Sequence, residues 1–105
     1  MDPRAPHAIT LQYVTACREG SLVGVLPEDV RRRPEGWSVY FRVAKGDKPY
    51  EVPLSPKGVI AAESLLDLHD YVPRRGRRQP TLVGVGYEQY RQWLKRAAAD
   101  AGVSA

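Results

Sequence analysis

Residues 37–54 carry the pattern that most constrains how this chain folds. In the first half of this segment apolar side chains alternate with polar ones, and the apolar set is Trp37, Val39, Phe41 and Val43. A period of two is typical of a β-strand that buries one face. Gly46-Asp47 then places glycine first, as a type II′ turn prefers, and a second short strand follows. The segment therefore predicts a β-hairpin.

The hairpin also has a preferred register. With the turn on residues 46–47, apolar side chains pair with one another: Val43 with Tyr50, Phe41 with Val52 and Val39 with Leu54. On the opposite face, Arg42 lies across from Glu51, which is a favourable cross-strand charge pair. Pro49 and Pro53 cannot donate backbone hydrogen bonds, so we expect the second strand to be short or to lie at an edge of the sheet.

Two amphipathic helices are predicted after the hairpin. Residues 56–72 have apolar side chains at helical spacing, and Ser55 with Pro56 is a typical start of a helix. Residues 87–101 repeat the pattern, with Trp93 at the margin of an apolar stripe made of Tyr87, Tyr90, Leu94 and Ala101. The charged side chains of both segments lie mainly on the opposite faces.

The remaining segments are shorter and less regular. LVGVL at 22–26 and LVGV at 82–85 each predict a short apolar strand that leads into a helix. After the first run, residues 27–33 begin with proline and two acids and end in three arginines, which predicts a helix of about two turns. Residues 8–19 fit either a strand or a helix, and we favour the helix. Residues 1–7 hold two prolines and are expected to be flexible.

Together these elements predict an α+β fold in a single domain of 105 residues. The one cysteine, Cys17, excludes an internal disulfide and is expected to be a buried thiol. The sequence contains no apolar run long enough to span a membrane and no signal-peptide pattern. We therefore expect a cytoplasmic protein that has no membrane partner.

Catalytic and metal-binding patterns are lacking. Glu63, Asp67 and Asp70 share one helix face, but no further ligand stands at a recognisable spacing, so we interpret them as a solvated surface. His69 is interpreted as a histidine at the edge of the core. The sequence has no phosphate-binding glycine loop, HExxH motif or nucleophile elbow. We predict a non-enzymatic protein that uses neither a metal nor a cofactor.

Basic side chains are concentrated in the last third of the chain. Residues 74–105 carry seven basic and two acidic side chains, a net charge of +5, whereas residues 1–73 carry a net charge of −1. Twelve of the 16 basic residues are arginine, the cation best suited to bidentate contacts with phosphate or carboxylate. This distribution favours a polyanion or an acidic protein surface as the partner.

The segment RRGRR lies within residues 73–80, which we expect to form a basic loop. Guanidinium groups on a bendable link can follow phosphates without reading sequence, and they can merge with the outward face of the last helix. The predicted binding residues are Arg74, Arg75, Arg77, Arg78, Arg91, Lys95 and Arg96, with an extension through Arg31, Arg32 and Arg33 if folding brings them close. The alternative is a solubilising loop beside an ordinary charged helix face.

The segment LVGVGYEQYRQWLKRA resembles the turn and second helix of a helix-turn-helix DNA-binding protein. The resemblance implies that base contacts are made by Glu88, Gln89, Arg91 and Gln92. That family requires a helix just before the turn, and here Gly76 and Pro80 interrupt it. The hairpin with LSPKGVIAAESLLDL is similar to the wing of a winged-helix regulator, but it lacks the upstream recognition helix. We assign the chain to neither family.

Two different functions would explain these features. We expect a nucleic-acid-binding accessory protein of bacterial, phage or plasmid type, which uses the arginine loop and the last helix. The alternative is a protein-binding adaptor, subunit or inhibitor that engages an acidic patch of a larger partner, with aromatic anchors among Trp37, Tyr40, Tyr50 and Trp93. A nucleic-acid surface predicts arginines on one positive face, whereas a protein-binding surface predicts an exposed aromatic or aliphatic patch beside them.

Overall fold

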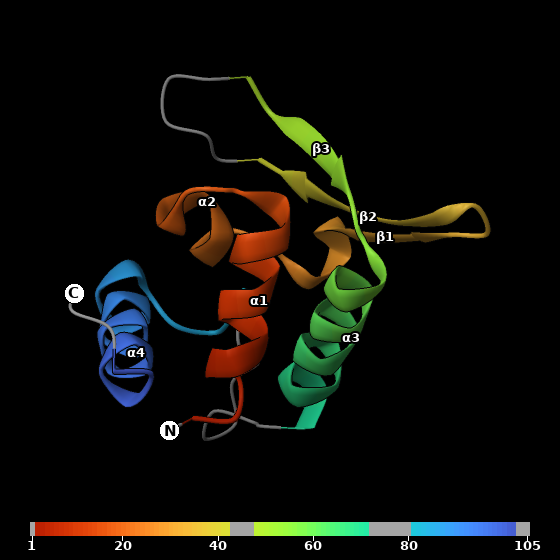
Figure 1. Ribbon diagram of the computed structural model, residues 1–105. Coiled ribbons are helices and arrows are strands. Elements are labelled where there is room, and N and C mark those ends of the chain that lie inside the picture. The colour runs from red at the N-terminus through yellow and green to blue at the C-terminus, as the bar shows by residue number, and fades with distance from the viewer. Residues whose placement is uncertain (1, 43–47, 72–80, 103–105) are drawn as a thin grey trace.

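The computed structural model describes residues 2–42, 48–71 and 81–102. Within these residues the chain forms four α-helices, a single 3₁₀ turn and three β-strands (Figure 1). The helices are α1 (Ala5–Thr15), α2 (Glu19–Val23), α3 (Pro56–Tyr71) and α4 (Tyr87–Asp100); the 3₁₀ turn is η1 (Pro27–Asp29); the strands are β1 (Val30–Arg33), β2 (Gly36–Phe41) and β3 (Tyr50–Pro53). The α+β prediction is confirmed, and α3 and α4 lie where the sequence placed them.

The three strands form one antiparallel sheet in the order β1-β2-β3. In the observed register Phe41 pairs with Tyr50, and Val39 pairs with Val52. The predicted register, which paired Phe41 with Val52, is therefore wrong by two residues. A shift of two keeps every side chain on its own face, so the alternation predicts the faces but not the register. The observed register stacks the rings of Phe41 and Tyr50, whose centroids are 5.1 Å apart.

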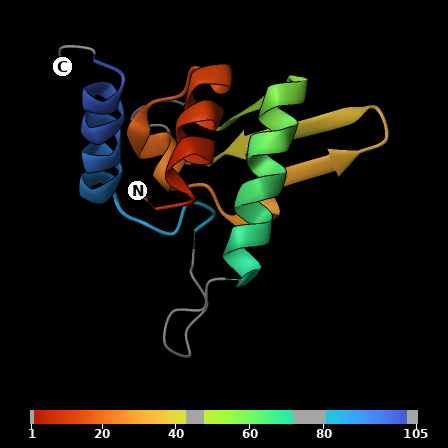
Figure 2. The same ribbon diagram turned by 60° about the horizontal axis from the view of Figure 1, so that its bottom comes forward.

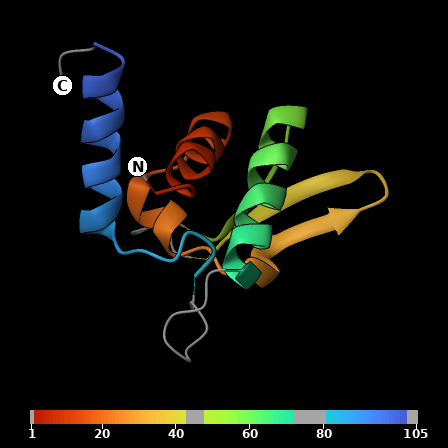
Figure 3. The ribbon, with the colours of Figure 1, turned by 90° about the horizontal axis from the view of Figure 1, so that it is seen from below.

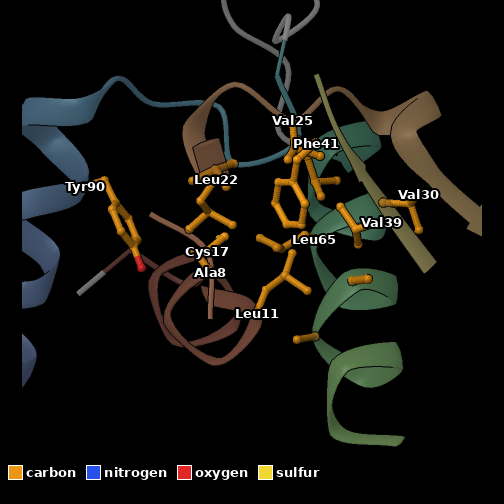
Figure 4. Close-up of a cluster of buried hydrophobic side chains, with 14 of the residues drawn as sticks. Ala8, Leu11, Cys17, Leu22, Val25, Val30, Val39, Phe41, Leu65 and Tyr90 are labelled. Carbon is orange, nitrogen blue, oxygen red and sulfur yellow. The ribbon is translucent and has the colours of Figure 1, made fainter. Parts of the chain in front are cut away.

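The core begins between the sheet and the helices α1 and α3 and continues past Leu22 to Tyr90 of α4 (Figure 4). Phe41 from β2, Leu11 from α1 and Leu65 from α3 are all fully buried and belong to one cluster of apolar side chains. α1 and α3 approach each other closely at Gly58, where an added Cβ would lie 3.1 Å from Cγ2 of Val14. Glycine at this position therefore allows the two helices to pack together.

The predicted helix over residues 27–33 is wrong. Only its first three residues turn, as η1, and the rest, VRRR, forms β1. The Asp29 carboxylate is almost fully buried; it accepts hydrogen bonds from the backbone N–H of Leu26, at 3.0 Å, and from Nε of Arg42, at 2.8 Å. Val30 is buried against the core. These tertiary contacts outweigh the order of acids and bases that favoured a helix.

Neither of the two short apolar runs is a strand. In the first run Leu22 and Val25 are buried three residues apart, which is the spacing of a helical turn, and α2 ends within it. In the second run the adjacent side chains of Leu82 and Val83 are both buried and the backbone is irregular. The runs do meet, because Leu82 N–H donates to the carbonyl of Val25 at 2.8 Å. Within the described residues this bond is not continued into a ladder.

The ambiguous segment 8–19 is mainly helical, as favoured, and most of it belongs to α1. The helix starts earlier than expected, at Ala5, inside the segment 1–7 for which flexibility was predicted. Ala5 is fully buried. Just before it, the Arg4 guanidinium donates a hydrogen bond to the carbonyl of Val83, 3.2 Å away. These contacts hold the start of the helix against the segment that precedes α4.

The elements lie in a row along the molecule (Figures 1, 2 and 3). α4 is at one end, α1 and α2 are in the middle, and α3 with the protruding β1–β2 hairpin is at the other end. α4 packs on α2 and α1. No helix in the described ranges combines the length and apolar character that a membrane span needs.

Candidate functional site

Two aromatic side chains hold α4 to the rest of the molecule. Tyr90 and Trp93 are buried, and their rings meet edge to face with centroids 6.3 Å apart. The Tyr90 hydroxyl donates a hydrogen bond to Oε1 of Gln12 in α1, at 2.6 Å. Burial raises the pKa of Tyr90, so the hydroxyl stays protonated and can donate. Trp93, predicted at the margin of the apolar stripe, is therefore part of the contact itself.

The outer surface of α4 carries three exposed cations, Arg91, Lys95 and Arg96. The Arg91 guanidinium lies over the ring of Tyr87, 5.8 Å from its centroid, which orients this side chain along the first turns of the helix. Lys95 and Arg96 are placed further along the helix, where they border a large cleft. All three predicted residues of this helix are thus accessible to a ligand.

The cleft, called the α4 cleft below, lies between α4, the residues just before it and the N-terminal segment. Its volume is about 880 Å³. Its charged and polar lining consists of Asp2, Arg4, Gln89, Gln92, Lys95 and Arg96, and its apolar lining includes Val85 and Trp93. Three cations against one carboxylate leave the cleft with a net charge of +2.

Arg4 forms a fixed wall of the α4 cleft. Its Nε and Nη2 donate to the two carboxylate oxygens of Asp2 at 3.0 and 2.8 Å, a bidentate arrangement, and Nη1 donates to Val83 O. The guanidinium carbon also lies 5.7 Å from the centroid of the Trp93 ring. The hydrogen bond from Arg4 lowers the pKa of Asp2. Because Asp2 offsets the charge of Arg4, the excess positive charge of the cleft comes from α4.

The most basic predicted segment is not described by the structure. Arg74, Arg75, Arg77 and Arg78 lie outside the described residues, as does the Gly46-Asp47 turn. The structure therefore places three of the seven main predicted binding residues, all on α4.

Arg31, Arg32 and Arg33 do not join the surface of α4. They lie in β1, at the opposite end of the molecule from α4 (Figure 1). Arg31 and Arg33 both donate to the carboxylate of Glu51, the latter at 2.9 Å, and the Arg32 guanidinium lies over the ring of Trp37. The predicted extension assumed a helix end, whereas pairing with β2 carries these arginines away.

The predicted pair of Arg42 with Glu51 is replaced by two other contacts. Arg42 donates to Asp29, as described above. Glu51 accepts from Oγ of Ser38 at 2.6 Å as well as from the arginines of β1. The hydrogen bond from Ser38 and the nearby arginines lower the pKa of Glu51. The register explains the change, because Tyr40 is the residue opposite Glu51.

The predicted aromatic anchors are largely covered. Trp93 is buried, and Trp37 and Tyr40 are half-buried, with the guanidinium of Arg31 4.6 Å from the centroid of the Tyr40 ring. Tyr50 is 38% exposed, although its ring stacks on the core. These side chains therefore mainly pack within the fold.

Two other large apolar side chains are more than half exposed instead. Tyr13 of α1 is 86% exposed and Ile60 of α3 is 64% exposed. A small hollow of about 230 Å³ between these helices is lined by Ile60 together with His7, Thr10, Lys57 and Ala61. Neither side chain belongs to the α4 cleft.

The reactive side chains form no recognisable catalytic centre in the described ranges. Cys17 is buried, and burial raises the pKa of its thiol, which agrees with the expected inert thiol. Glu63 and Asp67 are exposed on α3. Among the residues that the structure describes, no group of three or more His, Cys, Asp and Glu side chains is placed to hold a metal ion.

Two residues of the α4 cleft were not anticipated from the sequence. Asp2 and Arg4 stand in a segment without periodicity, and the bond from Arg4 to Val83 spans 79 positions of the chain. No local signal predicts such a contact. Gln89 and Gln92, which the helix-turn-helix resemblance singled out, do line the cleft.

Comparisons with protein-family models, with curated proteins and with solved structures found no significant match to this chain.

Proposed function

We propose that the protein binds nucleic acid without catalysing a reaction, through the basic surface of α4 and the arginine segment that precedes it. The observation that carries this proposal is the group of exposed cations Arg91, Lys95 and Arg96 beside a cleft of net positive charge. Cations at a protein surface attract the phosphates of a nucleic acid and release its condensed counterions.

The pattern of charge compensation supports this choice of surface. Arg31 and Arg33 are bound to Glu51, and Arg42 is bound to Asp29. Within the described ranges, the cations of α4 form no ion pair with a carboxylate. Their positive charge is therefore available to a ligand, whereas much of the positive charge at the other end of the molecule is already compensated.

Binding across a salt series tests the proposal. We expect duplex and single-stranded DNA and RNA to bind with an affinity that falls steeply as salt rises from about 0.05 to 0.2 M. The triple variant Arg91→Ala/Lys95→Ala/Arg96→Ala should bind more weakly. Its plot of log K against log salt should be shallower by about two to three, since each lost phosphate contact removes about 0.7–0.9 from the slope.

A matched variant tests whether binding depends on the cations of α4 or only on the net charge of the protein. Arg32→Ala/Lys48→Ala/Lys57→Ala also removes three exposed positive charges, but from β1, the residues before β3 and the first turn of α3. It should keep most of the affinity and the salt slope. The proposal fails if no polymer binds at low salt, or if the two triple variants lose affinity equally.

The alternative, a protein-binding module, is favoured by the exposed Tyr13 and Ile60. Large apolar side chains left in water are common at protein interfaces. If the protein is such a module, the variant Tyr13→Ser/Ile60→Ser should lose its binding to the partner protein and keep its binding to nucleic acid. If instead only the α4 triple variant loses binding, and what it loses is binding to nucleic acid, the first proposal is favoured.

A further inference from the structure

The α4 cleft has the size of a site for a small organic group. Its volume of about 880 Å³ falls within the range of 300–1,000 Å³ or so that is typical of ligand pockets. Phosphate contacts alone need only an exposed cationic surface and no hollow of this kind. The hollow therefore suggests that part of the nucleic acid other than its backbone enters the protein.

The lining combines two kinds of chemistry. Gln89 and Gln92 present amide side chains, each of which offers donors and an acceptor and can therefore match the edge of a nucleobase. Lys95 and Arg96 lie about one turn further along α4 and supply the positive charge that a phosphate needs. One helix thus places base-reading and phosphate-binding groups side by side.

The wall of the α4 cleft at Arg4 is already organised. The guanidinium of Arg4 is held by Asp2 and Val83 O and lies over the ring of Trp93. A flat guanidinium is a surface on which unstacked bases pack, whereas the Trp93 ring beneath it is buried. Because these contacts exist within the protein alone, a ligand entering the cleft does not have to order this wall.

We propose that the α4 cleft takes one unpaired nucleotide, with its phosphate at Lys95 and Arg96 and its base edge at Gln89 and Gln92. This inference rests on the proposed function and makes it specific, since it selects single-stranded nucleic acid over duplex. A base inside a duplex is paired and stacked, and it must be extruded at a cost before it can enter such a cleft.

The first test compares a short oligothymidylate strand with a duplex of equal length at equal salt. The single strand is expected to bind at least about tenfold more tightly. The variant Gln89→Ala/Gln92→Ala should lose roughly fivefold in affinity for the strand, keep its salt slope and leave the weak duplex binding unchanged. Ser64→Ala on α3, which also removes a small polar group from a helix surface, is the control.

A second test measures the fluorescence of Trp93, which lines the cleft. The chain contains two tryptophans, so Trp37→Phe leaves Trp93 as the only indole. The fluorescence of Trp93 should change when the strand binds, and Gln89→Ala/Gln92→Ala should weaken this signal in parallel with the affinity. Thymidine monophosphate should produce the same change at much higher concentration, because it brings the same base and phosphate without the polymer.

The outcomes separate the two proposals. If strand and duplex bind equally, or if the glutamine variant binds the strand unchanged, the inference fails while salt-dependent binding upholds the proposed function. If thymidine monophosphate binds with a change in Trp93 fluorescence but no polymer binds, the proposed function fails, and the inferred selection of single-stranded nucleic acid fails with it, because the site then takes a free nucleotide. If neither binds, both proposals fail.

Discussion

At the scale of single residues, Tyr90 links three parts of the molecule. Its hydroxyl donates to Oε1 of Gln12, and Nε2 of Gln12 donates to the carbonyl of Cys17 at 3.2 Å. The chain of hydrogen bonds therefore connects α4 to α1 and to the segment before α2. A polar group that is partly buried and then loses its partner costs more than the net value of one hydrogen bond.

The substitution Tyr90→Phe tests this link. It keeps the ring against Trp93 but leaves Oε1 of Gln12 without its donor, so we expect the free energy of unfolding to fall by about 1–2 kcal/mol. Urea denaturation measures the change. Tyr87→Phe, on a side chain that is 42% exposed, should change stability by less than about 0.5 kcal/mol. Equal effects of the two substitutions would contradict the assignment of the bond.

Properties of single residues were predictable to different degrees. The burial of Cys17 followed from the chemistry of a lone thiol in a chain with no reactive motif, and it is confirmed. The partners of polar side chains were not predictable. Asp29 looked like an acid in the first turn of a helix, yet it is buried and bound to Arg42. The two residues are 13 positions apart, so a local pattern does not predict their contact.

At the scale of elements, Glu51 stabilises the outer face of the sheet. Its carboxylate accepts hydrogen bonds from Ser38 of β2 and from Arg31 and Arg33 of β1, so it joins all three strands. Ser38 contributes most to lowering the pKa of Glu51, and the arginines add to it. A carboxylate whose folded pKa is lowered stabilises the fold above its ordinary pKa, and this contribution disappears as pH falls through the lowered value.

The lowered pKa of Glu51 predicts how the stability of Glu51→Gln depends on pH. The natural protein should lose stability as pH falls below the ordinary pKa of glutamate, 4.5, because the unfolded chain then binds a proton that the folded one resists. In Glu51→Gln the part of the stability that is lost on protonation of Glu51 is absent at every pH. The curves of stability against pH for the two proteins should therefore converge toward low pH. Denaturation at a series of pH values measures it, with Glu63→Gln as the control for a lost carboxylate. Parallel curves for the natural protein and Glu51→Gln would contradict the prediction.

The elements that the sequence predicted are those whose signal is local. α3 has a cap at Ser55, whose Oγ accepts from Gly58 N–H at 3.3 Å, and an apolar face that repeats over four turns or so. β1 was missed because VRRR has no alternation of its own and becomes a strand only through its pairing with β2. A pattern with a period of two does not encode which residues pair across the strands, such as Phe41 with Tyr50, whose rings stack in the observed register.

At the scale of the whole molecule, charge and shape are distributed unevenly. α4 at one end exposes Arg91, Lys95 and Arg96, while α3 toward the other end exposes Glu63 and Asp67. The α4 cleft could not be predicted from the sequence, since its walls come from segments about 80 positions apart that meet only after folding. The positive side of this distribution is where we expect a polyanion to approach.

Association rates test whether this uneven charge directs binding. Lys95→Glu/Arg96→Glu should slow the association of a single strand by about tenfold at 0.1 M salt or so, because it reverses the field at the cleft. Glu63→Lys/Asp67→Lys makes the net charge more positive by four, the same amount by which the α4 variant makes it more negative, but on α3. Charges separated by more than about 10 Å are screened at this ionic strength, so the rate should change less than about twofold. Stopped-flow fluorescence with a labelled oligonucleotide measures both rates. An acceleration by the α3 variant as large as the slowing by the α4 variant would mean that net charge governs association, and the positive face of α4 would then have no special role.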